Sequence, residues 1–392
     1  VSYRENAGRF NRKNLFISLR VGRKKRTWRP GMADNGNLLG ARRTLDGCLN
    51  ESEIDPGILS RNGWTLFDDS GTVRFDDKTG WIAGPAGGWN STNPPQDWYF
   101  FGYGHDYKSA LRDYTMFGGK VPLIPRYMLG LWWSRYWDYT AQDLKDIVRL
   151  FDTYSIPLDV LVIDMDWHRK NSWTGYTWDR KCFPDPEAFL QWAHQAGLRT
   201  TLNLHPHAGV QPFEAMHDAF RKAMGNSVKN GEAVPFRLSD PHFARLYFEL
   251  LHHPREREGV DFWWLDWQQG ESSEVPNLDP LQWLNHLHFL DHRREDRRGM
   301  LYSRWGGLGS HRYPIGFSGD TFAFWPVLEF MPFFTATGSN VLYGWWSHDI
   351  GAHFGPCDRE QFVRWVQFGA LSPCMRLHAE KNPLAERRPW AY

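Results

Sequence analysis

The sequence predicts an α/β fold, a (β/α)8 TIM barrel over residues 126–392 that follows a β-rich, irregular region over residues 1–125. Before residue 126 the chain is rich in Gly, Asn, Asp and Pro, with only short apolar runs. After it, short apolar runs alternate with helical patterns, as expected of βα units. The runs extend over about 250 residues, the usual size of such a barrel. No glycine-rich phosphate turn follows the first run, which argues against a doubly wound sheet.

The strands are expected where apolar, β-branched and aromatic residues cluster between turns. The clearest examples are Leu158–Asp164 (LDVLVID) and Asp261–Asp266 (DFWWLD), which have the composition of buried strands in a parallel sheet. The expected strands are residues 129–133, 158–164, 198–204, 261–266, 300–303, 315–318, 341–345 and 374–377.

The helices between these strands are indicated by start and stop signals. Thr140 with Asp143 matches a capping box. Asp185 precedes Pro186 at a first helical position, and Gly197 ends the same helix. The expected helices are residues 140–154, 186–197, 212–224, 281–294 and 359–371. The chain stops about 14 residues after the last strand, so we expect the barrel to lack its last helix.

The composition excludes several classes of protein. Lys and Arg number 46 against 45 Asp and Glu, a balance that argues against a nucleic-acid binder. Four cysteines in 392 residues are too few for a disulfide scaffold. No apolar run reaches about 18 residues, so no membrane span is expected, and no signal peptide is visible. The first residue is Val1 rather than Met, so we expect a processed chain or a fragment.

Charged side chains follow the expected strands, at the end of a barrel where chemistry takes place. They are Asp164, Asp166, His205, His207, Asp266, Arg304, Asp320, His348, Asp349, Arg376 and His378. The chain also contains 22 Trp residues, whose flat faces can stack on sugar rings, although most are expected in the core.

Two chemistries could use these residues. Glycoside cleavage needs two carboxylates for catalysis and further polar groups for the sugar hydroxyls. Metal-dependent hydrolysis could use His205 and His207, which point to one side of a strand, together with His348 and Asp349. The metal interpretation leaves the other strand-end aspartates and the many Trp residues unexplained, so we expect no metal and no cofactor.

Five ordered stretches resemble glycoside hydrolase family 31, the α-glucosidase and α-xylosidase family. They are residues 126–168, 261–270 (DFWWLDWQQG), 302–321 (YSRWGGLGSHRYPIGFSGDT), 347–354 (SHDIGAHF) and 364–378 (RWVQFGALSPCMRLH). The resemblance implies a retaining α-glycosidase whose partner is an oligosaccharide or glycoside substrate. It implies neither a nucleic-acid partner nor a membrane span.

The resemblance also implies roles for individual residues. Asp266 matches the catalytic nucleophile, and Asp320 matches the general acid/base. Arg304 matches an arginine near the nucleophile, where a cation would keep the carboxyl of Asp266 ionised. Asp320 must hold a proton at rest, so its surroundings are expected to raise its pKa.

Substrate-binding residues follow from the same resemblance. Asp164 and His378 match residues that contact sugar hydroxyls, and Asp349 matches a supporting carboxylate. The expected aromatic walls are Trp267, Phe317, Trp132 and Tyr136.

The sequence departs from the family pattern in two places. Gln269 stands where many relatives carry Glu, and the 54 residues from Asp266 to Asp320 form a compact segment. The compact segment points to an uncommon sugar specificity, such as an α-galactosaminide or an α-galactoside. The leading expectation, which follows from the resemblance, is an α-glucosidase-like enzyme. The alternatives are an α-xylosidase, an α-galactosidase, an α-N-acetylgalactosaminidase or a transglycosylase, and in a different class the metal-dependent hydrolase.

Overall fold

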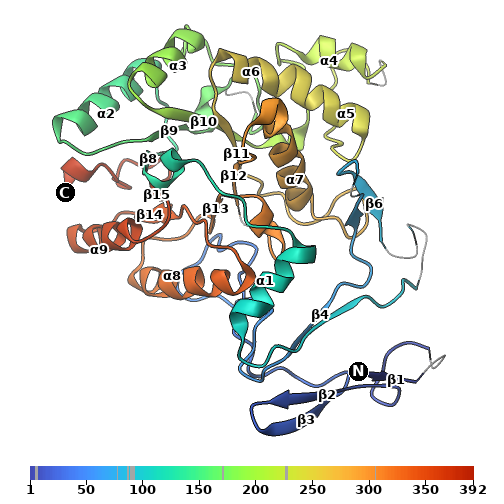
Figure 1. Cartoon of the computed structure of the whole chain (residues 1–392). Coiled ribbons are helices and arrows are strands. Elements are labelled where there is room, and N and C mark those ends of the chain that lie inside the picture. The colour runs from blue at the N-terminus through green and yellow to red at the C-terminus, as the bar shows by residue number, and fades with distance from the viewer. Residues whose placement is uncertain are drawn as a thin grey trace.

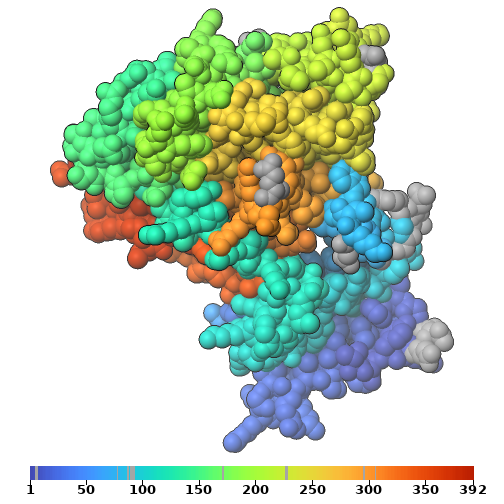
Figure 2. Space-filling model, turned by 45° about the horizontal axis from the view of Figure 1, so that its top comes forward, coloured from blue at the N-terminus to red at the C-terminus, as the bar shows by residue number. Residues whose placement is uncertain are grey.

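The structure, a computed structural model, describes residues 1–4, 8–76, 78–85, 88, 93–169, 172–225, 228–304 and 306–392, without the side chain of Glu295. The barrel forms the body of the molecule, and the N-terminal residues form a lobe that projects from it (Figure 2). The first two long strands lie at the end of this lobe, away from the barrel (Figure 1).

The barrel is one sheet of eight parallel strands in the order β13-β12-β11-β10-β9-β8-β15-β14. The bounds are β8 Leu131–Trp133, β9 Val160–Ile163, β10 Arg199–Leu204, β11 Phe262–Leu265, β12 Tyr302–Arg304, β13 Gly316–Phe317, β14 Asp349–Ile350 and β15 Met375–Leu377. A parallel bridge between Gly316 and Trp346 joins the two ends of the sheet. The barrel is therefore nearly closed, and the predicted TIM barrel is confirmed.

Helices cover the outside of the sheet (Figure 1). Their bounds are α2 Ala141–Thr153, α3 Pro186–Gln195, α4 His217–Ala223, α5 Pro241–Leu246, α6 His253–Glu258, α7 Pro280–His292, α8 Trp325–Gly338 and α9 Arg359–Ala370. The predicted capping box forms, because Thr140 accepts from the backbone of Asp143 and the Asp143 side chain accepts in return. Asp185 caps α3 in the same way, by accepting from the N–H of Ala188.

Side chains alternate between the inside and the outside of the barrel. On β11, Phe262 and Trp264 belong to the inner cluster of buried residues. Trp263 and Leu265 belong to the outer cluster, against the helices. The inner cluster is completed from the other strands and the segments that lead into them by Ile124, Met128, Trp132, Val160, Val162, Met300, Tyr302, Ile315, Phe317 and Cys374. This period of two decides which residues beyond each strand point into the barrel mouth.

The described residues of the N-terminal region form short antiparallel sheets and a helix. Strands β1 (Ser2–Tyr3), β2 (Leu15–Val21) and β3 (Lys24–Trp28) form the first sheet. Strand β4 (Thr65–Asp68) pairs with β7 (Trp98–Phe101), and β5 (Arg74–Phe75) pairs with β6 (Ile82–Gly84). Helix α1 (Tyr107–Gly118) then leads towards the barrel.

The prediction for the seventh strand is wrong. Residues 341–345 were expected to form it, but a 3-10 turn ends at Val341 and Leu342 adopts a left-handed conformation with φ of 67°. The strand is β14, further along the chain. Val341 and Tyr343 are apolar because they are buried in the outer cluster, which does not require a strand.

Two helical features also differ from expectation. Helix α8 was not predicted, because its own residues are apolar on nearly all sides, so the sequence shows no helical period there. The helix expected at residues 212–224 is only the short α4, and α5, a π-helical turn at Tyr247–His252 and α6 follow it before β11. After β15 the described residues form a 3-10 turn at Pro389–Ala391 and no further α-helix, as expected.

Candidate active site

A pocket of about 340 Å³ lies at the carboxyl ends of the barrel strands. Its walls are Tyr136, Asp164, Met165, Trp173, His205, Trp264, Asp266, Gln268, Asp320, His353, Phe354, His378, Glu380 and Lys381. The volume is at the lower end of the range for small-molecule sites. The pocket therefore suits a ligand the size of one sugar ring better than the interior of a long chain.

Asp266 stands directly after β11, on the inner side of the barrel. The residue is only 7% exposed, and its backbone N–H donates to the carbonyl of Leu204 on the neighbouring strand β10. One carboxylate oxygen accepts from Asn203 Nδ2 at 3.1 Å, and His205 Nε2 lies 3.2 Å from the same oxygen. Asn203, on β10, and His205, directly after that strand, are two positions apart, so both side chains reach the side on which Asp266 lies.

A single guanidinium group connects the two predicted catalytic carboxylates. Arg304 donates from Nε to Asp266 Oδ1 at 2.6 Å and from Nη2 to Asp320 Oδ1 at 2.9 Å. The ring of Phe317 lies beneath it, 4.9 Å from the guanidinium carbon. Gln268 donates to the other oxygen of Asp320 at 3.0 Å. Because one planar group binds both carboxylates, the two acids face the same small volume.

The surroundings shift the pKa values of these acids in opposite directions. Burial alone would raise the pKa of Asp266, but Arg304, His205 and Asn203 outweigh it and lower this pKa below its usual range. Burial raises the pKa of Asp320, against the opposing attraction of Arg304 and His353. One acid is thus held ionised and the other takes up a proton more readily than an ordinary aspartate, which is the direction that a nucleophile and a proton donor need.

Asp46, from the N-terminal region, completes this cluster. Its carboxylate accepts from Arg304 and from the backbone N–H of Asp320, the latter at 2.7 Å. The flanking residues are tied to the same loop, because Leu45 N–H donates to the carbonyl of Ser318 and Gly47 N–H to that of Asp320. The site is therefore shared between the barrel and the segment that precedes it.

Asp164 and His378 form another wall of the pocket. His378 Nε2 lies 4.0 Å from Asp164 Oδ2, and its Nδ1 is hydrogen-bonded to Ser134 Oγ at 2.7 Å. Burial and the nearby charge of Asp266 raise the pKa of Asp164 to about 8. Burial also lowers the pKa of His378 well below its usual value. Both groups are therefore favoured as neutral hydrogen-bonding partners at pH 7.

Asp349 lies deeper, in a buried ion pair with Arg376. Although burial opposes ionisation, Arg376 and the nearby histidines hold the pKa of Asp349 below its usual range. The Arg376 guanidinium is stacked among the rings of Trp264, Tyr302 and Phe317, at 5.0–5.5 Å. Asp349 is thus a supporting residue rather than a wall of the pocket.

The aromatic walls differ from those that were predicted. Of the four expected residues, only Tyr136 lines the pocket. Trp132 and Phe317 are completely buried inside the barrel, and Trp267 is packed against His207 and Phe236. Trp132 and Phe317 fill the interior of the barrel, and Trp267 belongs to the cluster outside it. The aromatic residues at the pocket are Trp173, Trp264 and Phe354, together with Tyr136.

The metal-site hypothesis does not fit the structure. His205 is buried beside Asp266, whereas His207 is exposed and packed against Trp267. His348 uses both ring nitrogens in hydrogen bonds, to Thr335 and Ser318. These residues do not form a common ligand set.

Among the described residues, one group could hold a metal ion by geometry: Asp349, His353 and His378. Arg376 already pairs with Asp349, so a cation there would meet a fixed positive charge. His353 Nδ1 instead lies 3.6 Å from Asp320 and 3.7 Å from Asp349. Although burial opposes protonation of His353, these two carboxylates raise its pKa overall. The group therefore fits hydrogen bonding within the pocket better than metal binding.

Several pocket residues were missed from the sequence. Trp264 could have been found, because it precedes Asp266 by two positions and so shares its side of the strand. Glu380 and Lys381 follow β15 closely, and Lys381 donates to Asp166 at 3.1 Å. Asp46 gave no such signal, because it follows no strand of the barrel.

The fold and the carboxylate cluster define a barrel with the features of a glycoside hydrolase. Comparison with known families supports this: the description "Glycosyl hydrolases family 31 TIM-barrel domain" matches residues 121–392. The chain belongs to glycoside hydrolase family 31.

Individual relatives are more distant. An alpha-xylosidase of Saccharolobus solfataricus is 23% identical over 75% of this chain, and Alpha-glucosidase 2 of Bacillus thermoamyloliquefaciens is 27% identical over 76%. The matches span only 42% and 41% of these relatives.

The fold is shared with solved structures. A GH31 alpha-xylosidase from a soil metagenome, complexed with xylose, has a TM-score of 0.65 and 19% identity. The match covers 89% of this chain and 56% of the xylosidase chain. The cycloalternan-forming enzyme of Listeria monocytogenes has a TM-score of 0.68 and 17% identity. The match covers 85% of this chain and 36% of that enzyme. Among the described residues, no helix is both long and apolar enough to span a membrane.

Proposed function

We propose that the chain carries the catalytic barrel of a retaining α-glycosidase that removes a terminal α-linked sugar, with an α-glucoside as the leading substrate. The observation that carries the proposal is the single guanidinium of Arg304, which binds both Asp266 and Asp320. The opposite pKa shifts of the two carboxyls support Asp266 as the nucleophile and Asp320 as the acid.

The proposed reaction has two displacements. In the first, the Asp266 carboxylate attacks the anomeric carbon while Asp320 donates its proton to the glycosidic oxygen, so the aglycone leaves as an alcohol. In the second, ionised Asp320 takes a proton from water, and the oxygen of that water displaces Asp266 from the anomeric carbon. The configuration is inverted twice and therefore retained. We expect the two carboxyls to be about 5–5.5 Å apart, as retaining enzymes require.

The remaining polar residues would bind the sugar. Asp164 and His378 face the pocket as neutral groups that suit sugar hydroxyls, and Tyr136, Trp173 and Trp264 offer aromatic faces. The pocket accommodates one ring, which favours attack at a chain end. Relatives named alpha-glucosidase and alpha-xylosidase support an α-glucoside first and an α-xyloside second. An α-galactoside, an α-N-acetylgalactosaminide and transfer to an acceptor sugar are the further alternatives.

The test is hydrolysis of 4-nitrophenyl α-glucoside, α-xyloside, α-galactoside and α-N-acetylgalactosaminide by the chain, with and without EDTA. We expect release from one α-glycoside, unchanged by EDTA, because no step of the mechanism needs a metal. NMR of the first product should show the α-anomer. Loss of activity in EDTA, the β-anomer as first product, or no release from any glycoside would each contradict the proposal.

Replacement of Asp320 by Asn should remove the basic limb of the pH profile. In the parent, activity falls as pH rises through the pKa of Asp320, because the proton needed by the leaving oxygen is lost. Burial raises this pKa, so the limb should lie above the usual range of an aspartate. Loss of a general acid lowers the rate by about 10²–10⁴-fold, and the deficit should be larger for a methyl glycoside than for a 4-nitrophenyl glycoside.

The comparison between leaving groups is the internal control for this variant. A 4-nitrophenolate leaves without protonation, whereas methoxide does not. An equal deficit for both substrates, with the basic limb retained, would assign the proton donor to another residue.

A further inference from the structure

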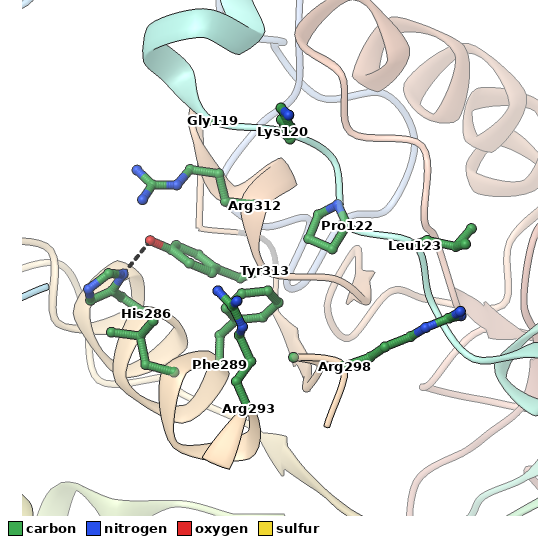
Figure 3. Close-up of a pocket in the computed structure, with 12 residues that line it drawn as sticks. Gly119, Lys120, Pro122, Leu123, His286, Phe289, Arg293, Arg298, Arg312 and Tyr313 are labelled. Atoms are coloured by element: carbon green, nitrogen blue, oxygen red, sulfur yellow. Dashed lines mark hydrogen bonds between the residues drawn. The ribbon is translucent and has the colours of Figure 1, made fainter. Parts of the chain in front are cut away.

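A second pocket, of about 470 Å³, lies at the opposite end of the barrel. Figure 3 shows the residues around it. It is lined by Gly119, Lys120, Pro122, Leu123, His286, Phe289, Leu290, Arg293, Arg298, Gly299, Arg312 and Tyr313. These residues come from the segment before β8, from α7 and the turn after it, and from the segments that lead into β12 and β13. Because these segments enter the amino ends of the strands, the pocket is separate from the candidate active site.

The pocket is strongly cationic. Four of its residues carry a positive charge, namely Lys120, Arg293, Arg298 and Arg312, and no carboxylate is among the lining residues. Within the described part of the chain, no ion pair joins any of these four side chains to an Asp or Glu. In Figure 3, Arg293 and Arg312 reach to the side of the pocket where Tyr313 and His286 meet, whereas Arg298 extends along the other side, near Leu123.

Two glycines leave the space that the stems of Arg312 and Arg293 occupy. A Cβ atom on Gly119 would lie 2.8 Å from Cδ of Arg312, and one on Gly299 would lie 2.7 Å from Cγ of Arg293. Each stem therefore packs against backbone that has no side chain. The guanidinium of Arg312 also lies over the ring of Tyr313, 5.3 Å from its centre. Such packing reduces the rotamer freedom that an arginine loses when it binds a ligand.

The other polar groups at this side of the pocket are already paired. His286 Nε2 donates to the carbonyl of Gly80 at 2.6 Å, so Nδ1 is the acceptor for the Tyr313 hydroxyl, also at 2.6 Å. Burial lowers the pKa of His286 to about 4, and Arg312 adds to this effect. The imidazole is therefore neutral at pH 7. Among the described side chains that line the pocket, none is an acid that could balance the guanidinium groups.

Stabilisation of a helix end explains only part of this arrangement. Arg293 follows α7, and a cation at a helix carboxyl end is favourable. Arg312 ends the 3-10 turn Ser310–Arg312, and its stem packs on Gly119, the C-cap of α1, so it also lies near a helix carboxyl end. Stabilisation of two separate helix ends does not require their cations to meet in one pocket. Cations gathered without acids repel one another, and an anion between them would remove that repulsion.

We propose that this pocket binds a phosphate monoester that has an apolar body. Guanidinium groups bind phosphate through two parallel hydrogen bonds, and Arg293 and Arg312 supply the forks. The apolar part of the ligand would lie against Phe289, Leu290 and Pro122, which line the same cavity. The site is independent of the proposed glycosidase activity and stands if no glycoside is cleaved.

The test is isothermal titration of the whole chain with phenyl phosphate, which combines the two features and is not a glycoside. We expect a Kd below about 1 mM and an affinity at least about tenfold higher than for inorganic phosphate or for benzyl alcohol. Absence of binding, or equal binding of benzyl alcohol, would overturn the proposal. Equal affinity for inorganic phosphate would show an anion site without the apolar component and would also contradict it.

Two double variants locate the binding. Arg293→Gln with Arg312→Gln should weaken binding at least about tenfold, since two charge-assisted contacts are lost. Lys24→Gln with Lys25→Gln is the matched control, because it removes the same amount of charge from the exposed hairpin of β2 and β3. That hairpin is itself strongly basic, since residues 1–30 contain ten Lys and Arg. It should leave the Kd unchanged, and equal weakening by both pairs would indicate attraction to general positive charge only.

A charge-retaining pair covers the case in which the Gln pair fails to fold. Arg293→Lys with Arg312→Lys keeps both charges and the apolar stems but loses both forks. We expect an intermediate loss of affinity, with the melting temperature close to that of the parent. Unchanged affinity in this pair would overturn the assignment of the two arginines.

Discussion

Replacement of Asp266 by Ala should lower kcat/KM for the preferred 4-nitrophenyl α-glycoside by about 10⁴-fold or more, as removal of a nucleophile does in other enzymes. Among the carboxylates that line the pocket, Asp266 is the one that accepts from both Arg304 and Asn203, and these contacts lower its pKa. The fold should survive, because Arg304 keeps its bonds to Asp320 and Asp46 and is not left unpaired. Initial rates and the melting temperature check both statements.

A control for this variant is available on the same strand. Asp261 precedes β11 at its amino end, where it accepts from His194 at 2.8 Å and from Arg199 at 3.1 Å. Asp261→Ala removes the same carboxylate group, but at the opposite end of the strand from the pocket, which Asp261 does not line. It should lower stability while leaving kcat/KM close to that of the parent.

Azide provides the chemical test of the nucleophile. In Asp266→Ala the space beside the anomeric carbon is open, so azide should restore glycone transfer and give the β-glycosyl azide by a single displacement. Rescue should be absent for Asp261→Ala. Activity within tenfold of the parent in Asp266→Ala would exclude Asp266 as the nucleophile and would require another carboxylate at the anomeric carbon.

The alternation of the barrel strands made much of the site predictable. Once DFWWLD is recognised as a strand, Asp266 must share the inner side with Trp264. The same rule brings Arg304 and His378 to the mouth of the barrel. The pattern is strong because strands of a closed sheet leave each side chain only two directions.

The aromatic walls were less predictable for the same structural reason. Trp132 and Phe317 also point inwards, but they lie within the strands, where they fill the barrel. The surface of the pocket comes instead from residues such as Trp173 and Phe354, which belong to loops. A sequence gives the direction of a strand residue more readily than the path of a loop.

Asp46 shows the limit of strand-based prediction. It lies 258 positions from Arg304 along the chain and still binds it. The backbone N–H groups of the neighbouring Leu45 and Gly47 hold it against the loop of Asp320, whose own N–H donates to the Asp46 carboxylate. Such a long-range contact has no local sequence pattern.

Arg304 should be the residue whose loss changes most properties of the site at once. Arg304→Met leaves Asp266, Asp320 and Asp46 without their common cation. Breaking a buried ion pair by removing one partner costs about 3–5 kcal/mol, so the melting temperature at pH 7 should fall clearly. Arg304→Lys should lose less stability, because the charge remains although the shared geometry does not.

The pH dependence of this loss has a defined sign. The pKa of Asp266 is lowered in the folded protein, below an unfolded value of about 3.9. The stabilisation is therefore present above about pH 4 and is lost as pH falls through the folded pKa. The difference in unfolding free energy between parent and Arg304→Met should accordingly be larger at pH 7 than at pH 3.5. A difference that does not change with pH would mean that Arg304 acts through packing on Phe317 alone.

Arg304→Met should also change the pH profile of activity. It should act on the acid limb, whereas Asp320→Asn acts on the basic limb. Without the guanidinium, burial is no longer outweighed, so the pKa of Asp266 should rise and the acid limb of kcat/KM should move to higher pH. Asp320→Asn removes the basic limb instead, because it takes away the proton donor. If Arg304→Lys leaves the acid limb in place, the ionisation of Asp266 is set by His205 and Asn203, and Arg304 serves only to hold the two carboxyls together.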